Sequence, residues 1–352
     1  MIPWQLPATC FLLMTIGSLT LQSVVPDLLA KHLLFWLISW LVFYITARTN
    51  FRSWKQLANP IFIIWFGLLF LVLVLPGTKS TARWFAFGPI LAQPSQLSLP
   101  VIALFLSQNL KQNYLSQLSK LWTYLIAIGL ALFMIMIEPD FGTTLVFLIS
   151  IGLTIVMVGL ANKVLLKLLV VILVGGIFSW FSLLKPYQKE RITSFVRPEE
   201  TSSASTYNTR QAIISVGSGG ILGLGLGRGT QSQLKFLPEK HTDFVFASLA
   251  EETGLVGGGL VIALYTWLIL SLSRQAERMD FDKKIMLVMT GIWLTVQTSI
   301  NIGMNLGALP VTGLTLPLIS YGGSSLISTM WLFGLVQSAI NSLETNPRLH
   351  LS

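Results

Sequence analysis

Charged side chains are scarce in this sequence. Only 11% of its 352 residues are Asp, Glu, Lys or Arg, whereas 53% are hydrophobic. A soluble domain carries about 25% charged residues, so this composition excludes an ordinary water-soluble globular protein. It indicates instead a chain divided into membrane-spanning helices, each of which needs about 20 mostly apolar residues.

Cysteine and histidine are also rare. The single cysteine, Cys10, excludes an intramolecular disulfide and a zinc site built from several cysteines. None of the three histidines has a second His or Cys at ligand spacing, so a histidine metal site is not expected. The N-terminal region lacks a basic segment and a small-residue cleavage site, so we expect residues 4–24 to be retained as the first span.

Intervals without charge divide the chain into ten expected spans. We therefore predict an all-α, polytopic membrane fold, with residues 1–352 forming a single membrane-embedded domain. The fourth span is expected to extend backwards through the apolar part of residues 85–96. The ten spans are residues 4–24, 32–47, 58–76, 97–109, 121–138, 142–160, 168–184, 244–272, 286–306 and 322–342.

The distribution of Lys and Arg predicts the orientation, because short cytoplasmic loops carry an excess of both. With the N-terminus inside, the short outer loops hold only Lys31, Lys79 and Arg83. The inner loops hold Arg48, Arg52, Lys55, Lys111, Lys120, Lys163, Lys167, Arg274, Arg278, Lys283 and Lys284. With ten spans, both termini are therefore expected in the cytoplasm.

One outer loop, residues 185–243 between spans seven and eight, is much longer than the others. Long loops cross the membrane largely regardless of charge, and loops of this length in compact proteins are usually functional or disordered. The glycine-rich run 217–229 lacks the Gly-Lys-Ser/Thr ending and the preceding strand of a phosphate-binding loop. We interpret this run as a close-packed segment at the membrane surface.

Carboxylates at the ends of apolar helices are the first candidates for chemistry, since they are costly near a membrane. Asp243 opens span eight and is either a functional acid or a helix N-cap. Glu251 and Glu252 should lie about 12–14 Å deeper, where an ion pair with a loop Lys or Arg is favoured over catalysis. Glu138 and Asp140 are expected to end one helix and begin the next, although an acid there could also hold a cation.

Several motifs occur together in a specific order. In chain order, they are Arg83-Trp84, Gly88-Pro89, Gln93-Pro94-Ser95, Gly217–Gly220, Phe236–Phe244 (FLPEKHTDF), Ala250-Glu251-Glu252, Asn301-Ile302-Gly303, Leu309–Gly313 (LPVTG) and Ile319–Ser325 (ISYGGSS). As a set, they resemble the SEDS family (shape, elongation, division and sporulation). Residues 207–211 and 229–234 resemble its RodA branch, which acts in cell elongation and shape maintenance.

The resemblance implies ten transmembrane helices and a peptidoglycan glycosyltransferase of the bacterial cytoplasmic membrane. Such an enzyme polymerises lipid II into glycan strands on the outer face. The implied partners are a class B penicillin-binding protein as transpeptidase and other membrane proteins of the elongation complex, without nucleic acid. The family's catalytic Asp falls on Asp243.

Lipid II carries a pyrophosphate that leaves readily once its charge is neutralised. One carboxylate acting as general base is then sufficient, and the sugar carbon C1 inverts. Asp243 could instead hold a divalent cation, Mg²⁺ or Mn²⁺, against the pyrophosphate, and no other cofactor is expected. The residues expected to bind substrate are Arg83, Trp84, Gln93, Ser95, Arg210, Gln211, Gln233, Lys240, His241, Thr242 and Ser324.

The sequence departs from the family at two positions, where Gln96 and Leu99 replace a usual Glu and Lys. This departure leaves open a weakly active scaffold that mainly recruits the transpeptidase. A lipid II transporter is the other alternative. Transporters tend to place their acids and bases at the membrane midplane, whereas the polar motifs here gather at the outer face, which favours chemistry there.

Overall fold

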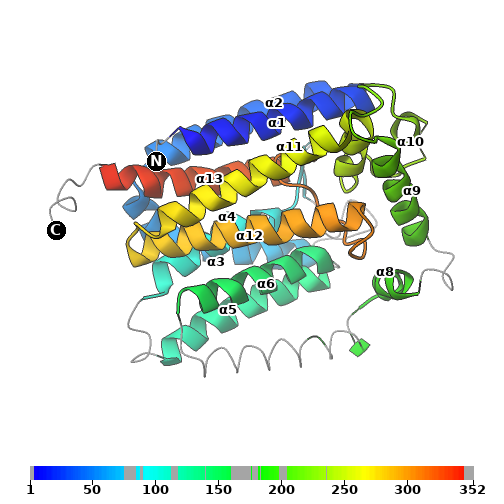
Figure 1. The fold of residues 1–352 in the computed structure, drawn as a ribbon. Helices are drawn as coiled ribbons and strands as arrows, with labels where there is room; N and C mark the ends of the chain where they lie inside the picture. The colour runs from blue at the N-terminus through cyan, green and yellow to red at the C-terminus, as the bar shows by residue number, and fades with distance from the viewer. Residues whose placement is uncertain are drawn as a thin grey trace.

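The computed structural model describes residues 4–74, 85–87, 90–111, 118–138, 140–159, 184–197, 204–234 and 236–344, together with Gly176 and residues 181–182. Long helices lie side by side in a bundle (Figure 1). They are α1 (Gln5–Val24), α2 (Leu29–Arg48), α3 (Phe51–Val74), α4 (Ser98–Asn109), α5 (Leu118–Ile137), α6 (Phe141–Met157), α11 (Val245–Ala276), α12 (Phe281–Asn305) and α13 (Gly323–Glu344). Two 3-10 helices, η1 (Pro26–Leu28) and η2 (Pro94–Leu97), precede α2 and α4.

The chain is a polytopic membrane protein, as predicted. Among the described residues, seven helices are long and apolar enough to cross a membrane, and α6 is a shorter apolar helix of 17 residues. The expected span 168–184 lies outside the described residues except for Gly176, residues 181–182 and Leu184. The predicted total of ten spans therefore stays a prediction.

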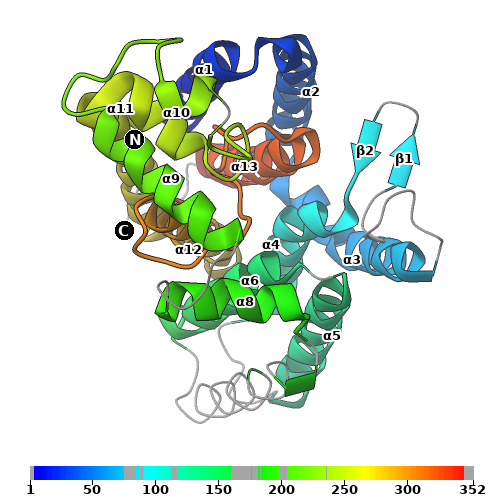
Figure 2. The same cartoon turned by 90° about the vertical axis from the view of Figure 1, so that its right-hand side faces the viewer.

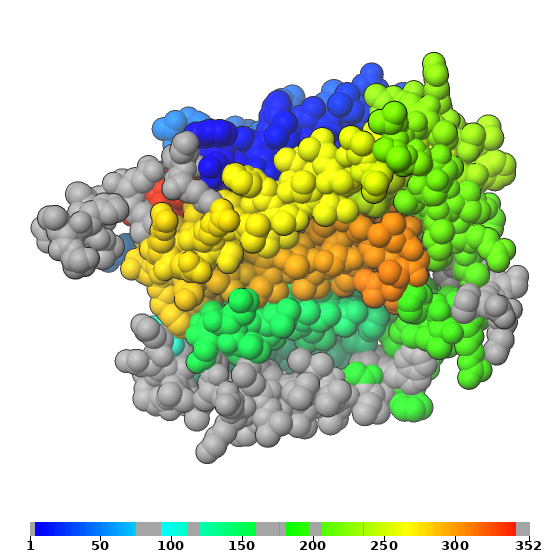
Figure 3. Space-filling model, viewed as in Figure 1, coloured from blue at the N-terminus to red at the C-terminus, as the bar shows by residue number. Residues whose placement is uncertain are grey.

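The two ends of the bundle differ. Figure 1 shows α1 beginning and α13 ending at one end, together with the turn between α11 and α12, in agreement with the predicted cytoplasmic side. The opposite end carries α8 (Pro186–Val196), α9 (Ala204–Ser218) and α10 (Thr230–Gln233). The long loop is thus partly helical, and in the space-filling view its described part covers the outer end of α11 and α12 (Figure 3).

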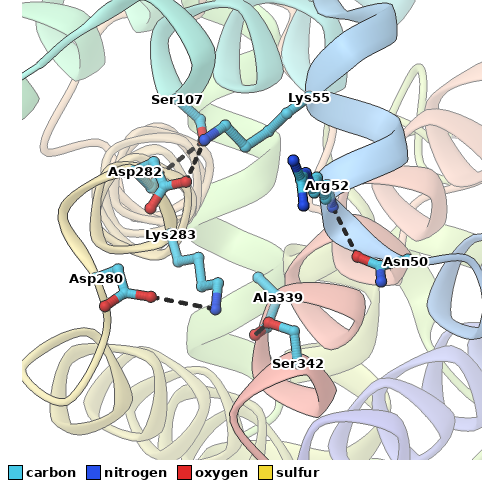
Figure 4. Close-up of polar contacts among 9 residues, drawn as sticks. All are labelled: Asn50, Arg52, Lys55, Ser107, Asp280, Asp282, Lys283, Ala339 and Ser342. Atoms are coloured by element: carbon cyan, nitrogen blue, oxygen red, sulfur yellow. Dashed lines mark hydrogen bonds and ion pairs between the residues drawn. The ribbon is translucent and has the colours of Figure 1, made fainter. Parts of the chain in front are cut away.

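Polar contacts tie the cytoplasmic ends of three helices together (Figure 4). Lys55 on α3 forms an ion pair with Asp282, in the first turn of α12. The Ser107 hydroxyl on α4 donates to the Asp282 carbonyl at 2.8 Å. The predicted third span began at residue 58 because charge was taken as its limit. In the structure α3 begins at Phe51 instead, and the charge of Lys55 near its start is paired with Asp282.

The predicted backward extension of the fourth span is wrong. Residues 85–87 form strand β1 (Phe85–Phe87), which pairs antiparallel with β2 (Ile90–Ala92), and the two strands project from the side of the bundle (Figure 2). Short apolar runs fit strand and helix equally well by pattern alone. The helical part begins only at Pro94, because proline lacks the N–H that a helix interior needs but is favoured at a helix start.

The glycine-rich run packs directly against α11, as predicted for a close-packed segment. A β-carbon on Gly219 would overlap the carbonyl oxygen of Ala250, and one on Gly223 would overlap that of Glu252. The backbone N–H groups of Leu224 and Gly225 each donate at 3.0 Å to carbonyls of α11. This contact needs an interruption in α11, which Gly254 provides with φ +67°.

The two glutamates of α11 fasten this loop, although not by the expected ion pairs. Glu251 is fully buried and accepts from the backbone N–H groups of Gln231 at 2.7 Å and Ser232 at 3.0 Å. Glu252 accepts from the Ser23 hydroxyl at 2.5 Å and from a backbone N–H at 3.1 Å. Neither forms a salt bridge within the described residues. Backbone N–H groups and the Thr230 hydroxyl donate to both oxygens of Glu251, whereas one oxygen of Glu252 is buried without a hydrogen-bond partner among the described residues.

Candidate active site

A polar cavity of about 450 Å³ opens near the outer end of the bundle. It lies between η2 with α4, the start of α6, the turn before α11, the middle of α12 and the start of α13. The side chains that line it include Gln93, Ser95, Gln96, Leu99, Asp140, Glu239, Thr242, Asp243, Gln297, Tyr321 and Ser324. We call it the polar cavity.

A second cavity of about 440 Å³ lies beneath α8, and we call it the α8 cavity. Its walls include apolar side chains from α6 and from the loop before α13, together with Arg191 of α8. Three residues line both cavities, namely Asp140, Asp243 and Gly313. Asp243 can therefore be reached from two sides.

The main chain around Asp243 is fixed by hydrogen bonds to three successive carbonyls, those of residues 241–243. The backbone N–H of Tyr321 donates to the first at 2.9 Å, and the hydroxyl of Ser320 donates to the second at 2.6 Å. Both donors come from the loop before α13. This part of the backbone is consequently held from outside its own helix.

Two buried asparagines of α12 hold the third carbonyl. The side-chain amides of Asn301 and Asn305 donate to the Asp243 carbonyl at 3.0 and 3.2 Å. The Asn301 amide also donates to the carbonyl of Leu314 at 2.7 Å, and the Asn305 oxygen accepts from the backbone N–H of Ala247 at 3.0 Å. These contacts join α12, the start of α11 and the preceding turn at one point.

The helix-capping alternative for Asp243 is wrong. The N-cap of α11 is Phe244, and no side chain caps that helix. Within the described part of the chain, the Asp243 carboxylate accepts no hydrogen bond. In contrast, Asp140 is the N-cap of α6 and accepts from the Thr143 N–H at 3.3 Å, as predicted for the acid that begins that helix. The Asp243 carboxylate is therefore available to a substrate.

The environment of Asp243 favours the protonated acid more than water does. Burial, followed by repulsion from Glu239 and Asp140, raises the pKa of Asp243 to about 6, while attraction to Arg191 acts in the opposite direction. A base is most effective when its pKa lies near the working pH, and a strongly perturbed carboxyl in a cleft is a candidate functional group. The geometry and the pKa point to the same residue.

Four of the predicted substrate-binding residues line the polar cavity with Asp243: Gln93, Ser95, Thr242 and Ser324. The Gln93 amide donates to the Ser95 hydroxyl at 2.8 Å and to Asp140 at 3.2 Å. The amide group of Gln93 and the hydroxyl groups of Ser95, Thr242 and Ser324 can form hydrogen bonds with the hydroxyl groups of a sugar. That they bind substrate stays a prediction.

Other predicted residues lie elsewhere. Arg210 lines a third cavity of about 410 Å³ on the far side of α8, and Gln211 follows it on α9. Gln233 donates to the carbonyl of Ser23 at 2.8 Å, and Lys240 donates to the carbonyl of Ser232. His241 packs against the ring of Tyr321, and burial lowers the pKa of this histidine. Arg83 and Trp84 lie outside the described residues.

Comparisons with known proteins identify the family of this chain. The model of a family of cell cycle proteins that comprises FtsW, RodA and SpoVE matches residues 7–345. The chain belongs to this family. Within the SEDS family, as it is also called, the chain is 37% identical over 264 residues to the peptidoglycan glycosyltransferase MrdB of Escherichia coli K12, covering 74% of this chain and 71% of MrdB.

Three further matches extend the likeness. The probable peptidoglycan glycosyltransferase FtsW of Coxiella burnetii is 35% identical, with 87% of this chain and 84% of FtsW covered. The crystal structure of Thermus thermophilus RodA superposes with a TM-score of 0.70 at 26% identity, covering 96% of each chain. A structure reported for the "structural coordination of polymerization and crosslinking by a peptidoglycan synthase complex" superposes with a TM-score of 0.82 at 28% identity. The match covers 97% of this chain and 98% of the chain in that structure.

Both departures from the SEDS pattern, Gln96 and Leu99, line the polar cavity. Leu99 is 3% exposed, and the Gln96 carbonyl accepts from the hydroxyl of Ser328 at 2.5 Å. The usual acid and base would therefore face the same space as Asp243. Their joint replacement leaves no uncompensated charge, which a buried site tolerates better than the loss of one partner.

Sequence reasoning did not select Arg191, Asn301 or Asn305 as individual site residues. The two asparagines are four residues apart on an apolar helix, and such spacing places them on one face. This spacing could therefore have identified the two asparagines as a pair from the sequence. Arg191 is one of several cations in a long loop, and no local pattern distinguishes it from the others.

Proposed function

We propose that this protein polymerises lipid II into glycan strands on the outer face of the bacterial cytoplasmic membrane, with Asp243 as general base. One observation carries the proposal: a carboxylate without hydrogen-bond partners in the described structure faces two cavities at the outer end of a membrane bundle. The names of the relatives supply the reaction, since MrdB and FtsW are both called peptidoglycan glycosyltransferases, FtsW with the qualifier "probable".

In the proposed reaction, Asp243 takes the proton of the acceptor sugar's C4 hydroxyl as that oxygen attacks C1 of the donor. The new bond joins this oxygen to C1. The bond from C1 to the pyrophosphate oxygen breaks, and its electron pair leaves with the pyrophosphate. Attack opposite the leaving group inverts C1, and no second carboxylic acid is required because pyrophosphate leaves without a proton.

The polar cavity is suited to the sugars of the acceptor. Its amide and hydroxyl groups, including those of Gln93, Gln297 and Ser324, come from three different elements. Hydrogen bonds from separate elements can fix the orientation of a sugar hydroxyl at the base, which supplies much of the rate in a two-substrate reaction.

A divalent cation held by Asp243 is the alternative to the general-base role, and the chemistry of the donor set fits a cation that the substrate helps to hold. Within the described residues, no group of three His, Cys, Asp or Glu could bind a metal alone. Mg²⁺ is commonly held by one or two carboxylates together with substrate phosphates. Asp243 with Glu239 or Asp140 would hold it, and a bound cation would neutralise the pyrophosphate.

A class B penicillin-binding protein is the proposed partner. The support comes from the matching structure of a peptidoglycan synthase complex that coordinates polymerization and crosslinking. A polymerase on the outer face would then deliver its glycan directly to a transpeptidase anchored in the same membrane.

The test is polymerisation of purified lipid II by the purified protein in detergent, with its transpeptidase partner if required. Asp243→Asn should fold normally but lose about 10²–10⁴-fold in rate, the usual contribution of a general base. Asp27→Asn is the matched control, because it removes an exposed carboxylate from η1 at the same end of the bundle.

Near wild-type polymerisation by Asp243→Asn would refute the role of Asp243. A wild-type protein that makes no glycan but still recruits the transpeptidase would favour the scaffold. Movement of lipid II across vesicles without polymerisation would favour the transporter.

A further inference from the structure

Arg191 of α8 points into the space beside Asp243. Its guanidinium forms no hydrogen bond or ion pair with any described residue. The guanidinium carbon lies over the ring of Tyr187, 6.0 Å from the ring centre. A guanidinium presents five N–H donors in a planar fork that matches phosphate oxygens. Such a group next to a cavity is arranged to bind an anion.

The two cavities that share Asp243 differ in charge. Among the described residues, no Lys or Arg lines the polar cavity, which contains Asp140 and Glu239 in addition to Asp243. The α8 cavity shares Asp140 and Asp243 with the polar cavity, but it lacks Glu239 and contains Arg191, and its other side chains are uncharged. Of the two, the α8 cavity is therefore the less negative, and among the described residues it is the one that offers a pyrophosphate a cation.

Arg191 and Asp243 approach each other at Gly313 without touching. A β-carbon on Gly313 would lie 3.1 Å from a terminal nitrogen of Arg191 and 3.6 Å from an oxygen of Asp243. The two side chains nevertheless form no salt bridge. An attacking oxygen beside Asp243 and a leaving oxygen beside Arg191 would therefore lie on different sides of C1, as a displacement at carbon requires.

We infer that the α8 cavity is the site of the donor's pyrophosphate, that Arg191 binds it, and that the acceptor sugar occupies the polar cavity. This inference rests on the proposed function. As the acceptor oxygen bonds to C1 and its proton passes to Asp243, the electron pair of the breaking bond moves onto the pyrophosphate beside Arg191. Charge therefore develops next to a cation that is already in position, which is the main source of electrostatic catalysis.

The third cavity extends this anion path. Arg191 lines it as well, together with Arg210 of α9, Pro310 and Val311. Pro310 and Val311 also belong to the α8 cavity, so the two spaces adjoin. Arg210 would thus meet the leaving group as it departs, which gives a role to a cation that lies away from Asp243.

Equilibrium binding of undecaprenyl pyrophosphate to the purified full chain in detergent tests the inference separately from polymerisation. Arg191→Gln should weaken binding at least tenfold, and Arg191→Lys should weaken it less, because a single ammonium replaces the fork. Binding of undecaprenol, which has the same tail without phosphate, should not change. Lys189→Gln is the matched control, since it removes a cation from α8 that lines neither cavity.

Activity provides the second readout. Arg191→Gln should lower the turnover number for lipid II by about 10²–10³-fold, as loss of one transition-state donor does, whereas Asp243→Asn should still bind undecaprenyl pyrophosphate. If Arg191→Gln binds this lipid as tightly as the wild type does, the inference is overturned while a polymerising wild type leaves the proposed function intact. The opposite result is that the wild type binds undecaprenyl pyrophosphate, Arg191→Gln does not bind it, and the wild type makes no glycan. In that case the inference stands and the proposed function fails.

Discussion

Acidification should inactivate the protein through Asp243. Because burial and the neighbouring acids raise the pKa of this carboxyl to about 6, a general base there is mostly ionised at pH 7 and mostly protonated at pH 5. Only the ionised form accepts a proton, so kcat/KM should rise with pH through about 6 and level off above it. At pH 5 it should be about one-tenth of the plateau, since the ionised fraction falls about tenfold per pH unit below the pKa.

The rise of kcat/KM with pH is the acid limb of the pH profile. Two neighbouring charges should move this limb in opposite directions. Glu239 raises the pKa of Asp243, so Glu239→Gln should move the limb to lower pH. Arg191 lowers that pKa, so Arg191→Gln should move it to higher pH, in addition to the loss of turnover. The assay is the initial rate of lipid II polymerisation between about pH 4.5 and 8, with protein integrity checked at each pH.

Coinciding acid limbs in the wild type and both variants would show that another group controls the profile. The same series separates the two roles considered for Asp243. A cation bound to a carboxylate competes with protons, so a limb that moves to lower pH as Mg²⁺ or Mn²⁺ is increased would indicate a metal ligand. A limb independent of these cations would indicate a general base.

Three other predictions concern the loop, the topology and the departures from the family. Gly223→Ala should destabilise the protein by about 1–3 kcal/mol in thermal unfolding, because the new methyl overlaps the carbonyl of Glu252; unchanged stability would contradict the packing. With the native cysteine replaced, Tyr207→Cys should react with an impermeant maleimide on intact cells and Glu277→Cys should not, and equal labelling would mean that the topology is wrong. Gln96→Glu should not increase polymerisation, since it adds an acid to a cavity that already holds three; a large gain would reveal a weakened enzyme.

Much of the fold follows from composition and charge. Apolar intervals predict the described spans because a membrane leaves a helix few alternatives. Asp140 as a helix start and the packed glycine run also follow from local chemistry, since caps and small residues act over a few positions. The strand pair at residues 85–87 and 90–92 was missed because six apolar residues do not distinguish a strand from a helix.

The site is only partly predictable, because it is assembled from distant segments. Asp243 is identified by its motif and by its place at the mouth of a span. The guanidinium of Arg191 comes near it only because α8 lies over the outer end of the bundle. Arg191 is more than one hundred residues away from Gly313 in sequence, yet both line the same cavity as Asp243. The family's motifs likewise suggest Gln233 and Lys240 for the substrate, whereas tertiary contacts direct both side chains to backbone carbonyls instead.

The hydrogen bonds to the carbonyls of residues 241–243 bear on how such a protein can diversify. These hydrogen bonds hold Asp243 in place through its main chain. The side chains that line the cavities can therefore change without disturbing them. Substitutions in those walls can therefore alter which sugars and stem peptides fit while the carboxylate keeps its position. Substrate range and catalytic position are separate traits here, and selection or design can vary the first without losing the second.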